Sequence, residues 1–157
     1  MRRSDKLIES MDTVSEVIRK CHVCRIGLSN DDRPYIVPVS FGYDEKAIFF
    51  HTAANNGMKL DYIRANSQVC FEFEHNVNVA PHEDKPCDWS FTFQSVIGFG
   101  QVEELMGDQE KIEGLQLIMK QYSEKNWDFN KISLNALSVW KITIESMTGK
   151  QSLNFVE

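Results

Sequence analysis

Residues 33–59 read RPYIVPVSFGYDEKAIFFHTAANNGMK, and the order of elements in this stretch decides the fold. Two apolar segments, 34–41 and 47–51, predict strands joined by a tight polar turn. An Asn-Asn-Gly loop follows at 55–57, and apolar residues at helical spacing over 60–64 predict a helix of about two turns. The stretch is therefore expected to form a hairpin that leads directly into a short helix.

The flanking sequence adds further strands to this hairpin. One segment alternates cleanly between apolar and polar residues, which is typical of a half-buried strand. Gly98 and Gly100 predict a bend or bulge in a long strand. The further strands are expected at 23–28, 68–74, 91–104 and 139–147. The aromatic residues expected in buried strand faces are Phe71, Phe73, Phe91, Phe93 and Trp140.

Two more helices and one long loop complete the prediction. Thr13 and Glu16 match a capping box at the start of a helix over 13–20. Asp108 is expected to cap a helix over 109–121. Residues 75–88 contain two prolines and two histidines, which predicts a long irregular loop.

The predicted connections favour an antiparallel barrel. Most strands follow one another through short turns, and closing such a sheet removes its exposed edges. The alternation of strand and helix that is typical of a Rossmann fold is absent, and so is a GxGxxG motif. The length of 157 residues fits one domain, so residues 1–157 are expected to form a single unit.

Charge and composition exclude several classes of function. The net charge of −6 argues against a nucleic-acid partner, because binding the phosphate backbone needs a basic face. No apolar run approaches the ~20 residues that span a membrane, and no secretory signal is recognisable at the start. The four cysteines are therefore expected to be free thiols in the cytoplasm.

Pro38 and Lys59 suggest where a ligand would bind. A proline inside a strand cannot donate to a neighbouring strand, so Pro38 marks an edge where the backbone faces a ligand, or an ordinary sheet edge. A helix N-terminus attracts anions, and this one carries Gly57 and Lys59, with the Thr52 hydroxyl nearby. A strand for a flat ring and a helix start for a phosphate together predict a mononucleotide site.

Four motifs in a fixed order carry a resemblance to a known family. They read RPYIVPVSF, IFFHTA, GMKL and FQSVIGFGQVEEL. This order resembles the FMN-binding split-barrel superfamily that includes pyridoxamine 5′-phosphate oxidase, and in particular its 5-nitroimidazole-resistance (Nim-type) branch. The resemblance covers nearly the whole chain. It implies a mostly β fold, an antiparallel split β-barrel with flanking α-helices, which forms a homodimer and binds FMN.

The resemblance also assigns roles to individual residues. Backbone groups along one strand would line the flavin ring; these residues are Tyr35, Ile36, Val37 and Pro38. The other cofactor contacts would come from His51, Thr52 and Lys59 near the ribityl phosphate, and from Gln94 and Ser95 across the dimer interface. His51 would also contact the substrate or donate a proton to it.

The chain departs from the family pattern at the phosphate. The segment from His51 to Lys59 is one residue longer than the pattern, and Met58 occupies a position where a basic residue is expected. Charge-assisted contacts are roughly twice as strong as neutral ones, so a missing cation would weaken the hold on a phosphate.

A metal site is the main alternative for the cysteines and is disfavoured. Cys21 and Cys24 form a CxxC pair, but a structural zinc site needs a second close pair, and Cys70 and Cys87 lie far apart in sequence. A redox CxxC needs a thioredoxin-like setting, which the predicted elements lack. No metal is therefore expected.

The expected function is the FMN-dependent reduction of a small organic substrate, and the resemblance makes a nitro-aromatic such as a 5-nitroimidazole the leading class. No nicotinamide-binding motif is visible, so NAD(P)H would dock transiently over the flavin. Pyridoxamine 5′-phosphate oxidation ranks lower, because the sequence ends at MTGKQSLNFVE without the arginine-rich segment of that oxidase. A non-catalytic module that holds flavin or haem is the other alternative.

Overall fold

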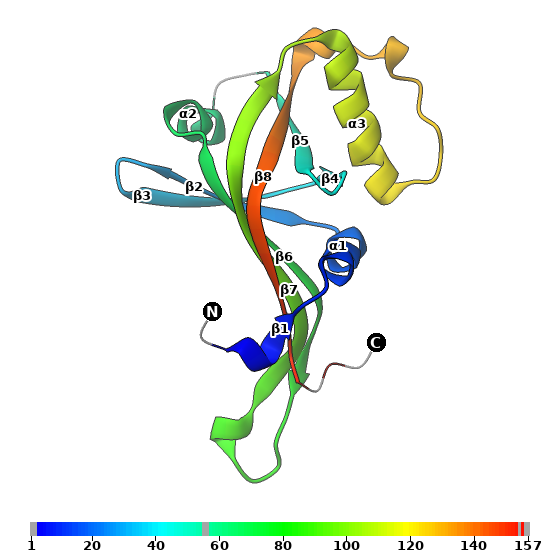
Figure 1. The fold of residues 1–157 in the computed structure, drawn as a ribbon. Coiled ribbons are helices and arrows are strands. Elements are labelled where there is room, and N and C mark those ends of the chain that lie inside the picture. The colour runs from blue at the N-terminus through cyan, green and yellow to red at the C-terminus, as the bar shows by residue number, and fades with distance from the viewer. Residues whose placement is uncertain (1–2, 55–56, 154, 156–157) are drawn as a thin grey trace.

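The structure is a computed structural model, and it describes residues 3–54, 57–153 and 155. Figure 1 shows its elements. The strands are β1 (Leu7–Ile8), β2 (Cys24–Asn30), β3 (Arg33–Val39), β4 (Gly42–Tyr43), β5 (Ala47–Ala53), β6 (Gln68–Ala80), β7 (Ser90–Leu105) and β8 (Leu137–Gln151). The helices are α1 (Met11–Lys20), α2 (Met58–Ala65) and α3 (Asp108–Tyr122), with short 3₁₀ turns at Ser4–Lys6, Pro86–Asp88, Phe129–Lys131 and Leu134–Ala136.

All the strands belong to one antiparallel sheet in the order β3-β2-β6-β7-β8-β5-β4, with β1 beside β8. β3 and β4 lie at the two ends of this order, yet only Ser40 and Phe41 separate them along the chain. Two residues cannot bridge a flat sheet of this width, so the sheet must curl until its ends meet. The barrel stays split between β3 and β4, which confirms the expected split β-barrel with flanking helices.

Aromatic side chains fill the barrel. Phe41, in the short link between β3 and β4, packs against Phe73 with ring centroids 4.8 Å apart. Phe50 stacks on Trp140 at 6.3 Å. The prediction of buried aromatic faces is confirmed for Phe71, Phe73 and Trp140, whereas Phe93 is half-buried and Phe91 is 54% exposed.

Two predicted helix starts need correction. α1 begins at Met11, and the Ser10 hydroxyl, rather than Thr13, caps it by accepting from the Thr13 N–H at 3.4 Å. Asp108 is the first residue of α3 instead of its cap, and the Glu110 carboxylate accepts from the Gly107 N–H at 3.1 Å. In both cases the actual cap, Ser10 or Gly107, lies one or more residues before the predicted cap.

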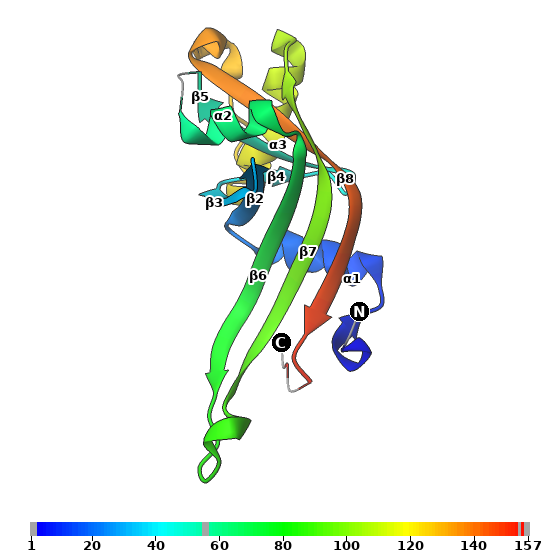
Figure 2. The same cartoon turned by 90° about the vertical axis from the view of Figure 1, so that its left-hand side faces the viewer.

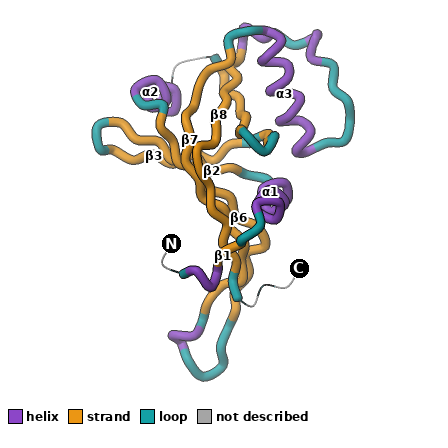
Figure 3. The backbone as a smooth tube through the Cα atoms, viewed as in Figure 1, coloured by secondary structure: helices purple, strands orange, loops and turns teal. Residues whose placement is uncertain are grey.

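The predicted long loop at 75–88 is wrong for residues 75–80, which belong to β6, whereas residues 81–88 lie between the strands as predicted. β6 continues to Ala80, and its pairing with β7 shifts between His75 and Asn78, where Asn76 adopts a positive φ of 52°. Such a bulge absorbs extra residues without ending the strand, so pairing resumes with Val79 opposite Phe91. We call residues 76–92 the arm, and Figure 3 shows that it extends below the barrel as two strand segments joined by a loop and a short helical turn.

The predicted irregularity at the glycines of β7 is confirmed. Pairing between β7 and β8 shifts between Phe99 and Gly100. A Cβ at Gly98 would lie 2.2 Å from Cζ of Phe71, so the ring occupies the space that any larger residue would need.

Among the helices of the described ranges, none has the length and apolar character needed to cross a membrane.

Candidate cofactor site

β3 is an edge strand, as Pro38 predicted. Among the described strands it pairs with β2 alone, with Pro38 opposite Arg25 and Ile36 opposite Gly27. The side chain of Ile36 is 67% exposed, and Pro38 is also exposed. The other edge of β3 therefore has backbone groups that can face a ligand at the split of the barrel.

An aromatic contact holds the short helix α2 beside β3. The rings of Tyr35 on β3 and Tyr62 on α2 lie 5.3 Å apart and are tilted by 56°. Tyr62, Leu60 and Ile63 are buried, so one face of α2 belongs to the core. The start of this helix is thus fixed near the edge strand, although Asn55 and Asn56 in the loop before it lie outside the described residues.

His51 and Thr52 project from opposite faces of β5, because side chains alternate along a strand. Thr52 is buried, and its Oγ1 accepts a hydrogen bond from Nε1 of Trp140 at 3.1 Å. His51 is exposed. Of the two adjacent residues assigned to the phosphate, Thr52 is already engaged in the core, and His51 is the one that reaches solvent.

The positive charge of Lys59 acts on His51. The pKa of His51 is lowered, first by partial burial and then by the positive charge of Lys59. Burial also lowers the pKa of Lys59, whose ammonium makes no hydrogen bond or ion pair among the described residues. A partly desolvated cation without a carboxylate partner, beside a histidine at the start of a helix, is suited to receive an anion.

Gln94 and Ser95 also face opposite ways, and two strands separate them from β3. Gln94 is 4% exposed, and its Nε2 donates to Oε1 of Gln151 at 3.3 Å. Its own Oε1 has no hydrogen-bond partner among the described residues. Ser95 lies half-buried on the other face of β7. A single chain thus gathers the β3, β5 and α2 residues, while Gln94 and Ser95 lie elsewhere on the sheet.

The sequence reasoning missed a groove on the outer face of the sheet. It has a volume of about 490 Å³ and lies over β2, β3, β6 and β7. Gly27, Cys70 and Phe99 are neighbours in register and form its floor, with Ile36 at one side. Cross-strand register creates this groove, and register is not visible in the order of residues.

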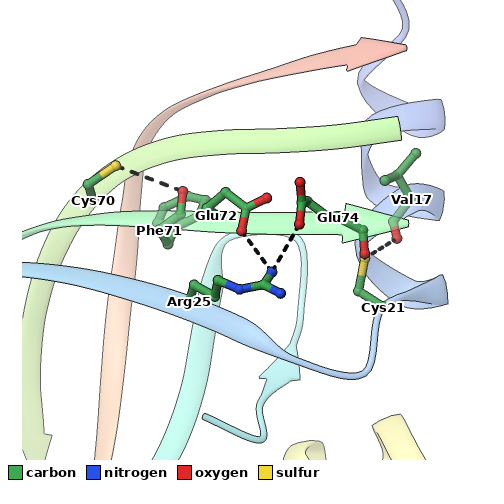
Figure 4. Close-up of polar contacts among 7 residues, drawn as sticks. All are labelled: Val17, Cys21, Arg25, Cys70, Phe71, Glu72 and Glu74. Atoms are coloured by element: carbon green, nitrogen blue, oxygen red, sulfur yellow. Dashed lines mark hydrogen bonds and ion pairs between the residues drawn. The ribbon is translucent and has the colours of Figure 1, made fainter. Parts of the chain in front are cut away.

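A charged cluster borders the same face (Figure 4). Nη1 of Arg25 lies 3.1 Å from a carboxylate oxygen of Glu72 and 3.4 Å from one of Glu74. The pKa of Glu72 is raised, because burial and the charge of Glu74 outweigh the opposite effect of Arg25. One guanidinium therefore holds two carboxylates together on the uncovered sheet.

The CxxC thiols are structural. Cys21 and Cys24 are buried, and burial raises the pKa of Cys21 to about 12 and that of Cys24 still further. The Cys21 thiol donates to the carbonyl oxygens of Val17 and Glu74 (Figure 4). Among the described residues, no three side chains of the metal-binding types are grouped closely enough to hold a metal.

The split barrel and its edge-strand site define the class of protein, and sequence comparison identifies the family. Residues 10–151 match the family described as pyridoxamine 5′-phosphate oxidase, so the chain belongs to that family. A comparison with curated proteins gives no significant match.

Solved structures confirm the fold. A candidate 5-nitroimidazole antibiotic resistance protein from Bacteroides thetaiotaomicron VPI-5482 is 26% identical, with 92% of this chain and 85% of that chain covered and a TM-score of 0.80. The FAD and haem binding protein from Mycobacterium smegmatis is 16% identical, with 97% and 76% covered and a TM-score of 0.80. The resemblance to the split-barrel superfamily is thereby confirmed.

Proposed function

We propose that this protein binds FMN and reduces a small organic substrate, with nitro-aromatics such as 5-nitroimidazoles as the leading class. The observation that carries the proposal is the partly buried cation Lys59 at the start of α2, whose charge acts on His51, together with the free edge of β3. Membership of the family and similarity to a candidate nitroimidazole-resistance protein support it.

The residues present fit a flavin mononucleotide. The free backbone of β3, from Tyr35 to Pro38, offers donors and acceptors to the edge of a flat ring. Lys59 and the N–H groups at the start of α2 suit the phosphate. The additional residue before Lys59 and the neutral Met58 leave Lys59 as the main cation there.

When bound, FMN would supply the electron transfer itself. The chain would hold the ring against β3 and keep His51 close to it. In the free protein the lowered pKa of His51 favours its neutral form, and His51 would act as a substrate contact or as a relay for a proton. A nicotinamide donor would dock transiently over the ring, from the solvent side.

A homodimer completes the site in this proposal. Two strands separate Gln94 and Ser95 from β3 in one chain, so a cofactor contact from this part of β7 would come from a second copy, through Ser95 on the outer face rather than through the buried Gln94. We further propose that the protein acts in the cytoplasm, where four free cysteines suit a reducing environment.

The activity can be tested under anaerobic conditions. Purified protein loaded with FMN is mixed with NADPH or NADH and a 5-nitroimidazole, and loss of the nitro absorbance is followed. We expect loss that depends on protein, FMN and donor, and that falls in the His51→Gln variant. Flavin that is reduced without any loss of the nitro absorbance would exclude this substrate class.

A second candidate is a non-catalytic carrier of flavin or haem. The structural similarity to the flavocytochrome Anf3 from Azotobacter vinelandii, with a TM-score of 0.84, supports this candidate. A protein that binds flavin tightly but accepts no electrons from any nicotinamide donor would support the carrier. Pyridoxamine 5′-phosphate oxidation, the third reading, would show as oxygen uptake with that substrate.

A further inference from the structure

The last residue of α3 is hydrogen-bonded to two links of the chain that are far apart in sequence. The Tyr122 hydroxyl accepts a hydrogen bond from the backbone N–H of Phe41 at 2.9 Å and donates one to the backbone carbonyl of His22, also at 2.9 Å. Phe41 lies in the link between β3 and β4, and His22 lies between α1 and β2. Figures 1 and 2 both show the yellow end of α3 beside β4. One hydroxyl therefore joins the start of β2 to the end of β3.

The two backbone groups lie where the pairing of β2 with β3 would continue. The last described pair at this end is Cys24 opposite Val39. His22 precedes this pair by two residues and Phe41 follows it by two, so the same register would place them opposite one another. Residues that face each other in this way in an antiparallel pair can exchange direct N–H···O bonds. The Tyr122 hydroxyl takes the place of a direct bond, because it accepts from one strand and donates to the other.

The inserted hydroxyl lets β3 leave β2 without unpaired backbone groups. After Val39 the chain crosses to β4, which pairs with β5 at the other end of the sheet. The two strands must separate there, whereas direct pairing would keep them about 5 Å apart. Phe41 is 0% exposed, so its N–H would carry the cost of an unsatisfied buried donor if nothing accepted from it. The hydroxyl spans the wider gap and satisfies both strands.

This gap lies at one end of the proposed flavin edge. Pro38 is the last of the residues expected along the ring, and Val39 alone separates it from the end of the described pairing. Because β3 has β2 as its one partner among the described strands, the end of β3 depends on contacts made after the pairing stops. Weakly supported strand ends open first in a folded protein. Loss of the Tyr122 hydroxyl would therefore loosen the flavin edge from the Pro38 end.

We propose that Tyr122 is a positioning residue for the flavin: its hydroxyl sets where β3 leaves β2 and so holds the backbone over 35–38 in place to receive the ring. It acts through the backbone of Phe41 rather than by contact with the ring. This inference rests on the proposed function, and it adds a residue from α3 to a site otherwise built from β3, β5 and α2.

The alternative is that Tyr122 only anchors the end of α3. Gln121 separates the two roles, because it lies at the same helix end and its Nε2 donates to the carbonyl oxygens of Arg19 at 2.9 Å and Cys21 at 2.8 Å. Both partners belong to α1 and its C-terminal cap, and neither belongs to β3. Gln121→Ala therefore loosens α3 from α1 and leaves the end of β3 bonded. Tyr122→Phe removes the bond to β3 and keeps the aromatic ring.

FMN titration and hydrogen exchange compare the two variants. Tyr122→Phe should raise the FMN dissociation constant about fivefold, the factor expected for one hydrogen bond, and should change the visible circular dichroism of the bound flavin. In the FMN-free variant, amides over 34–41 should exchange faster, while those over 95–105 keep their native rates. Gln121→Ala should leave all three readouts unchanged. Equal effects of the two variants, or faster exchange throughout the chain, would overturn the proposal.

The native protein provides a test that needs no folded variant. The Phe41 amide lies outside the strand pairing, and its bond to Tyr122 predicts strong protection in residue-resolved exchange measured by NMR. Exchange of this amide at the rate of an unstructured peptide would overturn the proposal. A native protein that binds no FMN would refute the proposed function alone, since the exchange results do not involve the cofactor. Native FMN binding with unchanged affinity in Tyr122→Phe would refute this inference alone.

Discussion

Lys59 is the residue on which the phosphate contact depends. It is partly desolvated and has no carboxylate partner among the described residues, which costs stability in the free protein and favours an anion when one is present. Neither feature follows from its place in the sequence, which indicated only a cation near a helix start.

Replacing Lys59 with alanine should weaken FMN binding by about 1.5–3 kcal/mol, because it removes a hydrogen bond to a charged group. The exposed Lys46 on the β4–β5 turn provides the control, and Lys46→Ala should leave affinity unchanged. Fluorescence titration of FMN measures both. Equal affinity of the Lys59→Ala variant and the native protein would show that this lysine does not contact the phosphate.

His51 should make FMN binding depend on pH. Its pKa is lowered in the free protein, by burial and by Lys59, and a phosphate placed beside it would raise that pKa. Binding would then take up a proton, so affinity should fall as pH rises through the range around the ordinary histidine value of about 6.5.

His51→Gln is the matched comparison, because the second ionisation of the phosphate, near pH 6, affects both proteins alike. The ratio of the two dissociation constants should change between pH 6.5 and pH 8.5 (about two units around the histidine range). A constant ratio would show that His51 does not face the phosphate.

Residue-scale prediction from sequence succeeded where one residue type has one consequence, as for Pro38 at the sheet edge. It was incomplete where two adjacent residues were assigned together. His51 and Thr52 cannot both reach one ligand through their side chains, and neither can Gln94 and Ser95, because strand alternation sends them to opposite faces. The burial of Thr52 against Trp140 depends on a partner 88 residues away.

At the scale of elements, close approach of α3 to β4 fixes one side of the barrel. A Cβ at Gly42 would lie 2.4 Å from the backbone carbon of Leu117, and no side chain can yield there. Gly42→Ala should therefore push the helix away and lower the free energy of unfolding by about 1–3 kcal/mol.

Gly57→Ala is the control, since a Cβ there meets none of the described residues within 4 Å and the φ of Gly57, 173°, is extended. Urea denaturation followed by circular dichroism compares the two variants. If Gly42→Ala were as stable as Gly57→Ala, the contact between α3 and β4 would be looser than described.

The elements of the hairpin and α2 were predictable because apolar spacing and turn residues are local signals. The arm was not. Prolines, histidines and asparagines over 75–88 indicated a loop, but the bulge at Asn76 allows the strands to continue to Ala80 and from Ser90. The pairing of β6 with β7 keeps those residues extended, and local composition does not predict that pairing.

At the scale of the whole molecule, the class of fold was predictable and the order of its strands was not. Short connections indicated an antiparallel barrel, yet β3 and β4, neighbours in sequence, form opposite ends of the sheet. The groove and the charged cluster at Arg25 both arise from this order and its register. They are properties of the assembled sheet.

The central claim is that this split barrel is a flavin protein that holds FMN at the edge of β3. The most direct measurement is the absorption spectrum of freshly purified protein, with mass identification of what is released on denaturation and an FMN titration of any empty fraction. We predict a yellow protein that releases FMN, or an empty protein that takes FMN up stoichiometrically. A colourless protein that binds no FMN on titration would contradict the claim.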